Sequence, residues 1–191
     1  MTTLSPTSPT LVLIDIQKEY ATPGRPFFLA GIAPSLENCR RLLAGARRSG
    51  ARIIHVQHLG DGAVFNRDAP ESGFIDGFAP GQAEIHLTKS KLPCYANPRF
   101  AGLLSESGAG PIFIAGYGST MCCFATIASA ALHDQRLTFV HDASGARAAG
   151  GLSEAEQHRN AVVMLAAHGG QTTTDEALAA LAAAAPAMAA E

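Results

Sequence analysis

The sequence predicts a three-layer α/β/α fold, in which a doubly wound, mainly parallel sheet of six strands (a Rossmann-like sheet) has helices on both faces. The first observation is that short apolar runs alternate along the chain with longer segments that suit helices, a pattern typical of parallel sheets. The second is that the runs at 10–16 and 112–115 are almost wholly apolar, without polar alternation. Such runs indicate central strands that are buried on both faces.

The strands are expected at residues 10–16, 52–58, 83–89, 112–115, 136–141 and 171–174. Asp15 lies at the end of the first of them, Lys89 ends the third, and Asp142 follows the fifth. Residues 116–120 break the fourth strand before the next helix. Open α/β sheets bind ligands at the carboxyl ends of their strands, so functional side chains are expected at these positions.

Helices are expected over residues 34–49, 98–105, 121–132 and 153–167, and from Asp175 onward. In the first helix, Pro34 suits the first turn and Gly50 the C-terminal stop. The fourth begins with Ser153, and Glu156 three residues later completes a pattern that resembles a capping box. The segment at 59–82 has no clear period, and a loop of this length inside a compact domain indicates a functional loop.

Length and composition favour one domain without a nucleic-acid or membrane partner. The chain has 191 residues, of which 47% are hydrophobic, and a formal net charge of −2. These values suit a single domain over residues 10–191, after a flexible lead-in at 1–9. No membrane span is expected, because no run of about 18 apolar residues occurs. The N-terminus lacks signal-peptide features and the four cysteines form no disulfide framework, so a cytoplasmic location is expected.

Three polar side chains are expected at one edge of this sheet. Asp15 and Lys89 lie at strand ends, and Cys122 lies at a strand-to-helix turn. Because parallel strands share a carboxyl edge, their separation along the chain is no obstacle to contact. The start of a helix lowers the pKa of a thiol, so Cys122 is a candidate nucleophile and Asp15 a candidate base. Each residue alone also suits a structural role, and Cys123 is expected to pack in the core.

Two histidines raise the question of a metal site. His55 and His58 lie three apart on the second strand, so their side chains point to opposite faces. We expect one to pack and His58 to face the crevice. No Asp-x-His sequence accompanies them, and no glycine-rich phosphate loop is present. The sequence therefore predicts neither a bound metal nor a cofactor.

The surroundings of these residues resemble the isochorismatase-like cysteine hydrolases. Asp15 lies in Leu-Val-Leu-Ile-Asp-Ile-Gln, Lys89 in Ile-His-Leu-Thr-Lys, and Cys122 in Gly-Tyr-Gly-Ser-Thr-Met-Cys-Cys-Phe-Ala-Thr. The resemblance extends from about Leu11 to about Leu178.

This resemblance implies an Asp-Lys-Cys triad. Asp15 would be the general base, Lys89 its charged partner, and Cys122 the nucleophile that forms a thioester, which water then hydrolyses. The resemblance also implies a cis peptide between Tyr117 and Gly118, and an oxyanion hole made by the N–H groups of Gly118 and Cys122. Oligomers are common in the family, so a homo-oligomer (a dimer or a tetramer) is expected.

Two departures from related enzymes narrow the expected reaction. The metal ligands that nicotinamidases of the superfamily carry after the second strand are missing where this chain has residues 55–61. The nucleophilic cysteine, which vinyl-ether hydrolases of the superfamily can lack, is kept. The predicted function is therefore a metal-independent cysteine amidohydrolase that cleaves the C–N bond of a small amide, ureido or carbamoyl substrate.

The candidate substrate-binding residues come from strand ends and flanking loops: Gln17, Tyr20, His58, Phe65, Tyr95 and Tyr117. Three other functions stay open at this point. One is a non-catalytic small-molecule binding protein (a pseudoenzyme) on the same fold, and another is an isochorismatase-type vinyl-ether hydrolase. The third is a thiol-redox protein using Cys122 and Cys123, although an adjacent pair without Cys-x-x-Cys is a poor redox couple.

Overall fold

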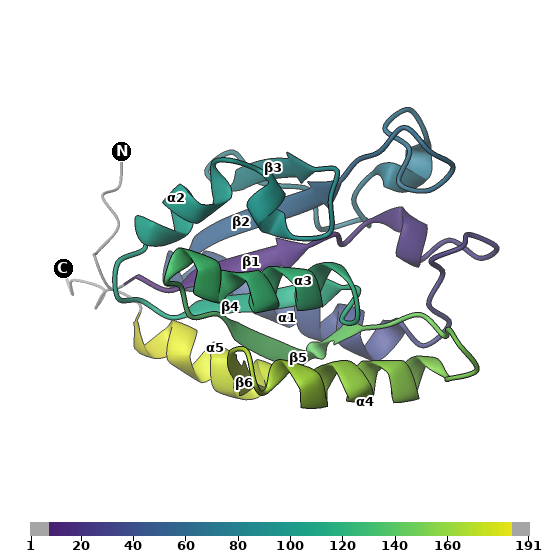
Figure 1. Ribbon diagram of the computed structural model, residues 1–191. Helices are drawn as coiled ribbons and strands as arrows, with labels where there is room; N and C mark the ends of the chain where they lie inside the picture. Colours follow the sequence, from purple (N-terminus) through teal and green to yellow (C-terminus); the bar gives the residue numbers. More distant parts are fainter. Residues whose placement is uncertain (1–7, 185–191) are drawn as a thin grey trace.

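A six-stranded sheet forms the middle layer of the fold (Figure 1). The computed structural model describes residues 8–184, and its strands are β1 Thr10–Ile14, β2 Arg52–His58, β3 Ile85–Lys89, β4 Ile112–Tyr117, β5 Thr138–Gly145 and β6 Gly170–Thr172. Neighbouring strands are all parallel, in the order β3-β2-β1-β4-β5-β6. The predicted three-layer fold is therefore confirmed.

The strand order places a switch point at the centre of the sheet. The chain runs outward from β1 through β2 to β3, and then returns to the other side of β1 with β4. In open α/β sheets this reversal leaves a crevice at the carboxyl ends of the two central strands. The residues that follow β1 and β4 thus lie where such folds bind ligands.

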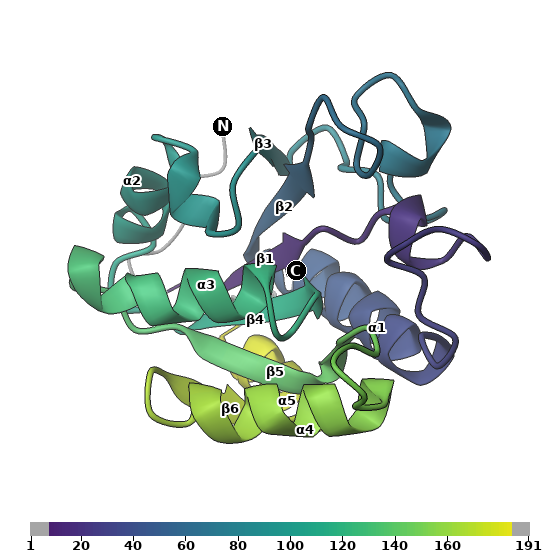
Figure 2. The same ribbon diagram turned by 45° about the vertical axis from the view of Figure 1, so that its right-hand side comes forward.

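Helices cover both faces of the sheet: α1 Ala33–Ser49, α2 Phe100–Ser105, α3 Cys122–Ser129, α4 Glu154–Leu165 and α5 Thr174–Ala183. Helices α1 and α5 pack on one face, and α2, α3 and α4 on the other (Figure 2). Strand β1 serves both cores, with Leu11 and Leu13 toward α1, and Val12 and Ile14 toward α3. This alternation is what a central strand requires.

The structure shifts the ends of several predicted elements. The first strand stops at Ile14 rather than at 16, because the backbone of Asp15 is left-handed, with φ of 52°. The fifth strand continues to Gly145, because it stays paired with β4 beyond its predicted end. The helix predicted to reach 132 ends at Ser129 and continues as a 3-10 turn, Ala130–His133.

Two helix ends follow their sequence signals. Ser153 accepts the N–H of Glu156, whose carboxylate accepts the N–H of Ser153, so the predicted capping box precedes α4. Gly50 ends α1 with a left-handed φ of 68°, which glycine adopts without the steric penalty of a Cβ.

The predicted lead-in at residues 1–9 falls mostly on residues 1–7, which lie outside the described residues. The end of the helix predicted from Asp175 onward, at 185–191, also lies outside them. Among residues 8–184, none of the helices combines the length and the apolar character needed to cross a lipid bilayer.

Candidate active site

Asp15, Lys89 and Cys122 come together at the carboxyl edge of the sheet. Asp15 follows β1, Lys89 ends β3, and Cys122 is the first residue of α3. The Nζ atom of Lys89 lies 2.8 Å from Asp15 Oδ2 and 3.2 Å from Cys122 Sγ. The three residues are 0%, 4% and 4% exposed, respectively. The ammonium therefore bridges a carboxylate and a sulfur in a site that is almost closed to solvent.

A glycine on β4 allows β1 to approach closely beside Asp15. Gly116 pairs with Ile14 and has φ of 112°. A Cβ at this position would clash with the carbonyl oxygen of Ile14, so no other residue fits without moving the strand. Asp15 itself has a left-handed backbone, which is uncommon outside glycine and is frequent at functional sites.

The turn before α3 presents two free backbone donors. The peptide between Tyr117 and Gly118 is cis, as the resemblance implied. The carbonyl oxygen of Gly118 accepts the N–H groups of Met121 and Cys123. Within residues 8–184, the N–H groups of Gly118 and Cys122 donate to no acceptor. These two unpaired donors lie in the turn that leads into Cys122, and they are the donors that the resemblance assigns to an oxyanion hole.

Burial dominates the electrostatics of Cys122. Burial raises the pKa of its thiol, the charge of Asp15 raises it further, and Lys89 acts in the opposite direction. The expectation that the helix start lowers this pKa is therefore wrong for the resting site, because desolvation of the thiolate outweighs the favourable helix terminus. A raised pKa favours the protonated thiol, so a nucleophilic reaction at Cys122 needs a base.

Asp15 has the free oxygen that such a base needs. Its Oδ1 is fully buried and has no hydrogen-bond partner within the described part of the chain. Burial lowers the pKa of the Lys89 ammonium, but the charges of Asp15 and Cys122 have the opposite effect. The result is a pKa well above the usual value for lysine. Lys89 is thus a permanent cation that leaves Oδ1 of Asp15 available.

His58 completes the surroundings of the ammonium. Its Nδ1 lies 3.1 Å from Lys89 Nζ. His55 is buried elsewhere, with Nε2 2.8 Å from a carboxylate oxygen of Glu84. The two histidines thus separate as their spacing on the strand predicts, with His58 in the site.

The same arrangement bears on metal binding. Ligand atoms of Asp15, His58 and Cys122 lie within 4.8 Å of one another, which is compact enough for a shared cation. However, Lys89 Nζ contacts all three residues. The Lys89 ammonium therefore occupies the position between the three side chains where a metal ion would bind. Because a second cation does not fit there, this geometry favours the prediction of a metal-independent site.

An aromatic wall lies beside the triad. The ring of Phe65 is 5.2 Å from that of His58 and 5.5 Å from that of Tyr20. Tyr20 is 2% exposed, and its hydroxyl forms no hydrogen bond within the described residues. A Cβ built on Gly118 would lie 3.6 Å from this hydroxyl. Tyr20 thus brings an unused polar group next to the cis peptide.

Three of the predicted substrate-binding residues have other partners. Gln17 donates both side-chain N–H groups, to the carbonyl oxygens of His58 and Ser72, and accepts the N–H of His58. Its amide has no donor left for a substrate. Gln17 therefore positions the end of β2, and these contacts do not support its predicted role in substrate binding.

The hydroxyls of the two other tyrosines also have partners outside the triad. Tyr117 is fully buried, and its hydroxyl lies 3.0 Å from Ser35 Oγ on α1. Tyr95 donates to Gln135 Oε1 at 2.7 Å, and its ring stacks on His133 at 4.1 Å, beside the turn that follows α3. Both therefore pack and pair with structural neighbours, and these contacts do not support their predicted role in substrate binding.

A buried ion pair near the aromatic wall was not predicted. The carboxylate of Glu19 is fully buried and lies 2.9 Å from Nη2 of Arg25, which also donates to the carbonyl oxygen of Ala63. The N–H of Phe65 reaches the same carboxylate at 3.4 Å. Glu19 thus ties the loop after β1 to the loop after β2. The sequence holds no local signal of this pairing, since both residues lie in a loop without periodicity.

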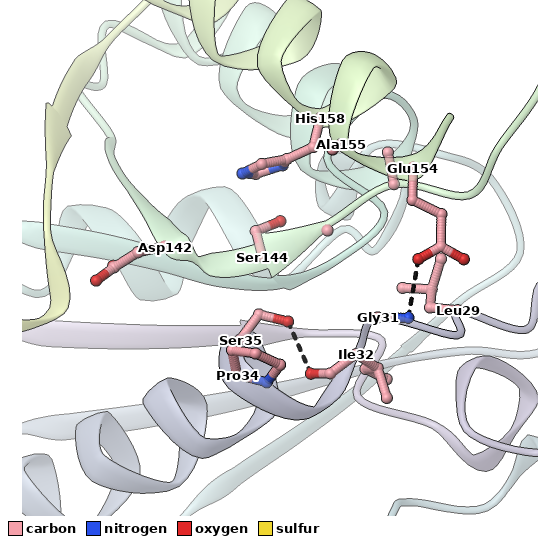
Figure 3. Close-up of a pocket in the computed structure, with 12 residues that line it drawn as sticks. Leu29, Gly31, Ile32, Pro34, Ser35, Asp142, Ser144, Glu154, Ala155 and His158 are labelled. Atoms are coloured by element: carbon pink, nitrogen blue, oxygen red, sulfur yellow. Dashed lines mark hydrogen bonds between the residues drawn. The ribbon is translucent and has the colours of Figure 1, made fainter. Parts of the chain in front are cut away.

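Two hollows lie near the site. A groove of about 240 Å³ lies between residues 59–67 and 88–98, and Lys89 is the one triad residue in its lining. A second pocket, of about 330 Å³, lies between α1, the end of β5 and α4 (Figure 3). Its lining includes Ser144 and His158, and His158 Nδ1 lies 2.9 Å from Ser119 Oγ in the turn before α3. The triad is not part of the lining of this second pocket.

The chain is similar to characterised hydrolases. It is 29% identical to a maleamate amidohydrolase of Pseudomonas putida over 155 residues, 73% of each chain. It is also 29% identical to a streptothricin hydrolase of Streptomyces noursei, over 70% of this chain and 48% of that one. A ureidoacrylate amidohydrolase of Cronobacter turicensis is 27% identical, over 56% of this chain and 44% of that one.

Solved structures agree with the fold. An isochorismatase from Pseudomonas putida KT2440 superposes with a TM-score of 0.82 at 29% identity, covering 92% of this chain and 93% of the other. A cysteine hydrolase from Pseudomonas syringae pv. phaseolicola has a TM-score of 0.81 at 19% identity, covering 95% of each chain, and supports the fold alone. The family model of the isochorismatase domain matches residues 9–177. The chain therefore belongs to the isochorismatase family of hydrolases.

Proposed function

We propose that this chain is a metal-independent cysteine amidohydrolase that cleaves the C–N bond of a small amide, ureido or carbamoyl substrate. One observation carries the proposal: the Lys89 ammonium bridges Asp15 Oδ2 and Cys122 Sγ, while Asp15 Oδ1 has no partner. A buried carboxylate with a free oxygen beside a thiol is what proton abstraction from a nucleophile requires. The similarity to the maleamate and ureidoacrylate amidohydrolases supports C–N cleavage.

In the first half-reaction, Asp15 takes the proton of Cys122 Sγ, and the thiolate attacks the carbonyl carbon of the substrate. The carbonyl oxygen becomes an oxyanion, which the N–H groups of Gly118 and Cys122 stabilise. The tetrahedral intermediate collapses by breaking the C–N bond, and the protonated Asp15 gives its proton to the departing nitrogen. The amine or ammonia leaves, and the acyl group stays on Cys122 as a thioester.

In the second half-reaction, Asp15 takes a proton from water, whose oxygen attacks the thioester carbonyl. The C–S bond breaks, the thiolate of Cys122 recovers a proton from Asp15, and the carboxylic acid leaves. One water molecule is consumed for each C–N bond. Lys89 stays protonated throughout and balances the negative charge as it moves between carboxylate and sulfur.

A substrate panel tests the proposal. Purified protein is incubated with maleamate, an N-carbamoyl amino acid, a ureidoacrylate and simple aliphatic amides, and ammonia release is measured with and without EDTA. We expect ammonia release from at least one of them, unchanged by EDTA and absent in Cys122→Ala. A protein that binds these compounds without hydrolysing any would be the pseudoenzyme alternative, and metal-dependent release would contradict the proposal. The expected dimer or tetramer stays a prediction, which light scattering tests.

Tyr20→Phe is expected to lower kcat/KM about tenfold, because it removes one hydrogen bond to the substrate. The free energy of unfolding should change little, since the Tyr20 hydroxyl has no partner among residues 8–184. Both quantities are measured by steady-state kinetics and urea denaturation.

Tyr117→Phe is the matched control for Tyr20→Phe. It removes the hydroxyl that pairs with Ser35, so it should cost about 1 kcal/mol of stability and leave kcat/KM within about twofold. Equal kinetic losses in the two variants would show that Tyr20 has no special place in substrate binding.

A further inference from the structure

Lys89 uses every donor that it has. A lysine ammonium carries three N–H groups and no acceptor. Three acceptors surround Nζ: Asp15 Oδ2 at 2.8 Å, His58 Nδ1 at 3.1 Å and Cys122 Sγ at 3.2 Å. Two of these belong to the proposed triad, and the third is a histidine to which the triad assigns no role.

The geometry determines the protonation state of His58. Because the ammonium can only donate, Nδ1 of His58 must be an unprotonated acceptor, and the proton of the neutral ring lies on Nε2. Burial lowers the pKa of His58, and the charge of Lys89 lowers it further, against a smaller effect of Asp15. These effects favour the same neutral ring.

The chain also holds this ring in place. Gln17 binds both the N–H and the carbonyl oxygen of His58, at 2.8 Å and 2.9 Å, which ties the end of β2 to the segment that follows β1. The ring of Phe65 packs 5.2 Å away. A histidine clamped through its backbone and its ring keeps Nδ1 directed at Lys89.

We propose that neutral His58 is a positioning residue, which holds the Lys89 ammonium between Asp15 and Cys122 by accepting its third N–H. The proposal rests on the proposed function for its kinetic consequences alone. Three ionisable groups face the ring: Lys89 from β3, Asp15 after β1, and Cys122 from α3. When His58 Nδ1 takes a proton, the imidazolium and the Lys89 ammonium face each other 3.1 Å apart. Both groups are then positively charged donors, and they repel each other. The ammonium then loses its position, and activity falls on the acid side as one proton binds.

The kinetic test compares three variants with wild type. We expect kcat/KM of wild type to fall with decreasing pH, with a midpoint below the ordinary pKa of histidine. His58→Asn keeps an acceptor oxygen where Nδ1 lies but does not titrate, so its acid limb should move to lower pH. His58→Leu has no acceptor, so kcat/KM at pH 8 should fall about tenfold further than in His58→Asn. The control is His86→Asn on β3, whose Nε2 contacts Gln57 instead, and it should keep the wild-type profile.

A spectroscopic test does not depend on the substrate. The imidazole ¹⁵N shifts of the full chain, with His58→Asn used to assign the His58 signals, report the tautomer and the midpoint of titration directly. We expect the Nε2–H tautomer at pH 7.5 and titration below the ordinary histidine range. An Nδ1–H tautomer, or an unchanged acid limb in His58→Asn, would overturn the proposal. If no amide is hydrolysed, the proposed function fails, and the ¹⁵N result still decides the state of His58.

Discussion

Cys122→Ala is expected to lower kcat/KM for the best amide substrate by at least about 10⁴-fold, because it removes the atom that forms the thioester. The fold should survive, since alanine differs from cysteine by one sulfur atom at a helix start. Initial rates at saturating and limiting substrate measure the loss. Intact mass of acid-quenched enzyme should show an acyl adduct on wild type and none on the variant.

Cys123→Ala is the matched control for this experiment. Cys123 is fully buried, and its sulfur lies 4.0 Å from Ser144 Oγ rather than in contact with Lys89. Its truncation should cost some stability through a small cavity and leave kcat/KM within about threefold. Similar losses in the two variants would mean that Cys122 is not the unique nucleophile, and an adduct that persists in Cys122→Ala would place the chemistry elsewhere.

Lys89→Met is expected to lower both the free energy of unfolding and kcat/KM strongly. The pair between Lys89 and Asp15 is fully buried on both sides, so removal of the ammonium leaves an unpaired carboxylate in the interior. Breaking a buried pair in this way costs about 3–5 kcal/mol. Loss of the charge that stabilises the thiolate should lower kcat/KM by on the order of 10³-fold. Urea denaturation and steady-state kinetics measure the two effects.

The double variant Asp15→Asn/Lys89→Met separates the two effects. It has no unpaired charge, so it should recover most of the stability that Lys89→Met loses. It should recover no activity, because asparagine cannot take the thiol proton. If the double variant is as unstable as the single one, the cost comes from lost packing of the lysine side chain rather than from a buried charge. Recovery of activity would show that Asp15 is not the base.

Local sequence patterns were sufficient to predict most of the fold. Strand runs and helix signals are short-range properties, and the alternation of strands and helices leaves few topologies other than a parallel sheet. That topology alone places the ends of β1 and β3 and the start of α3 on one edge. The proximity of Asp15, Lys89 and Cys122 was therefore predictable before any distance was known.

Which polar side chains remain free was not predictable. Three polar residues that were predicted to bind substrate are instead paired with residues far away along the chain. Gln17 pairs with His58, 41 positions away, Tyr95 with Gln135, 40 positions away, and Tyr117 with Ser35, 82 positions away. Nothing local in the sequence records such pairings. The same holds for His58, whose ring became the third acceptor of Lys89 only through the spacing of β2 and β3.

Periodicity and strand direction are therefore sufficient to predict the layered fold, the sheet edge that carries the site and the residue types that meet there. Two other properties depend on the folded structure: the raised pKa of Cys122, where burial of the thiol outweighs the helix terminus, and the division between free and paired polar groups. Both depend on desolvation and on contacts across the chain, which no short segment encodes.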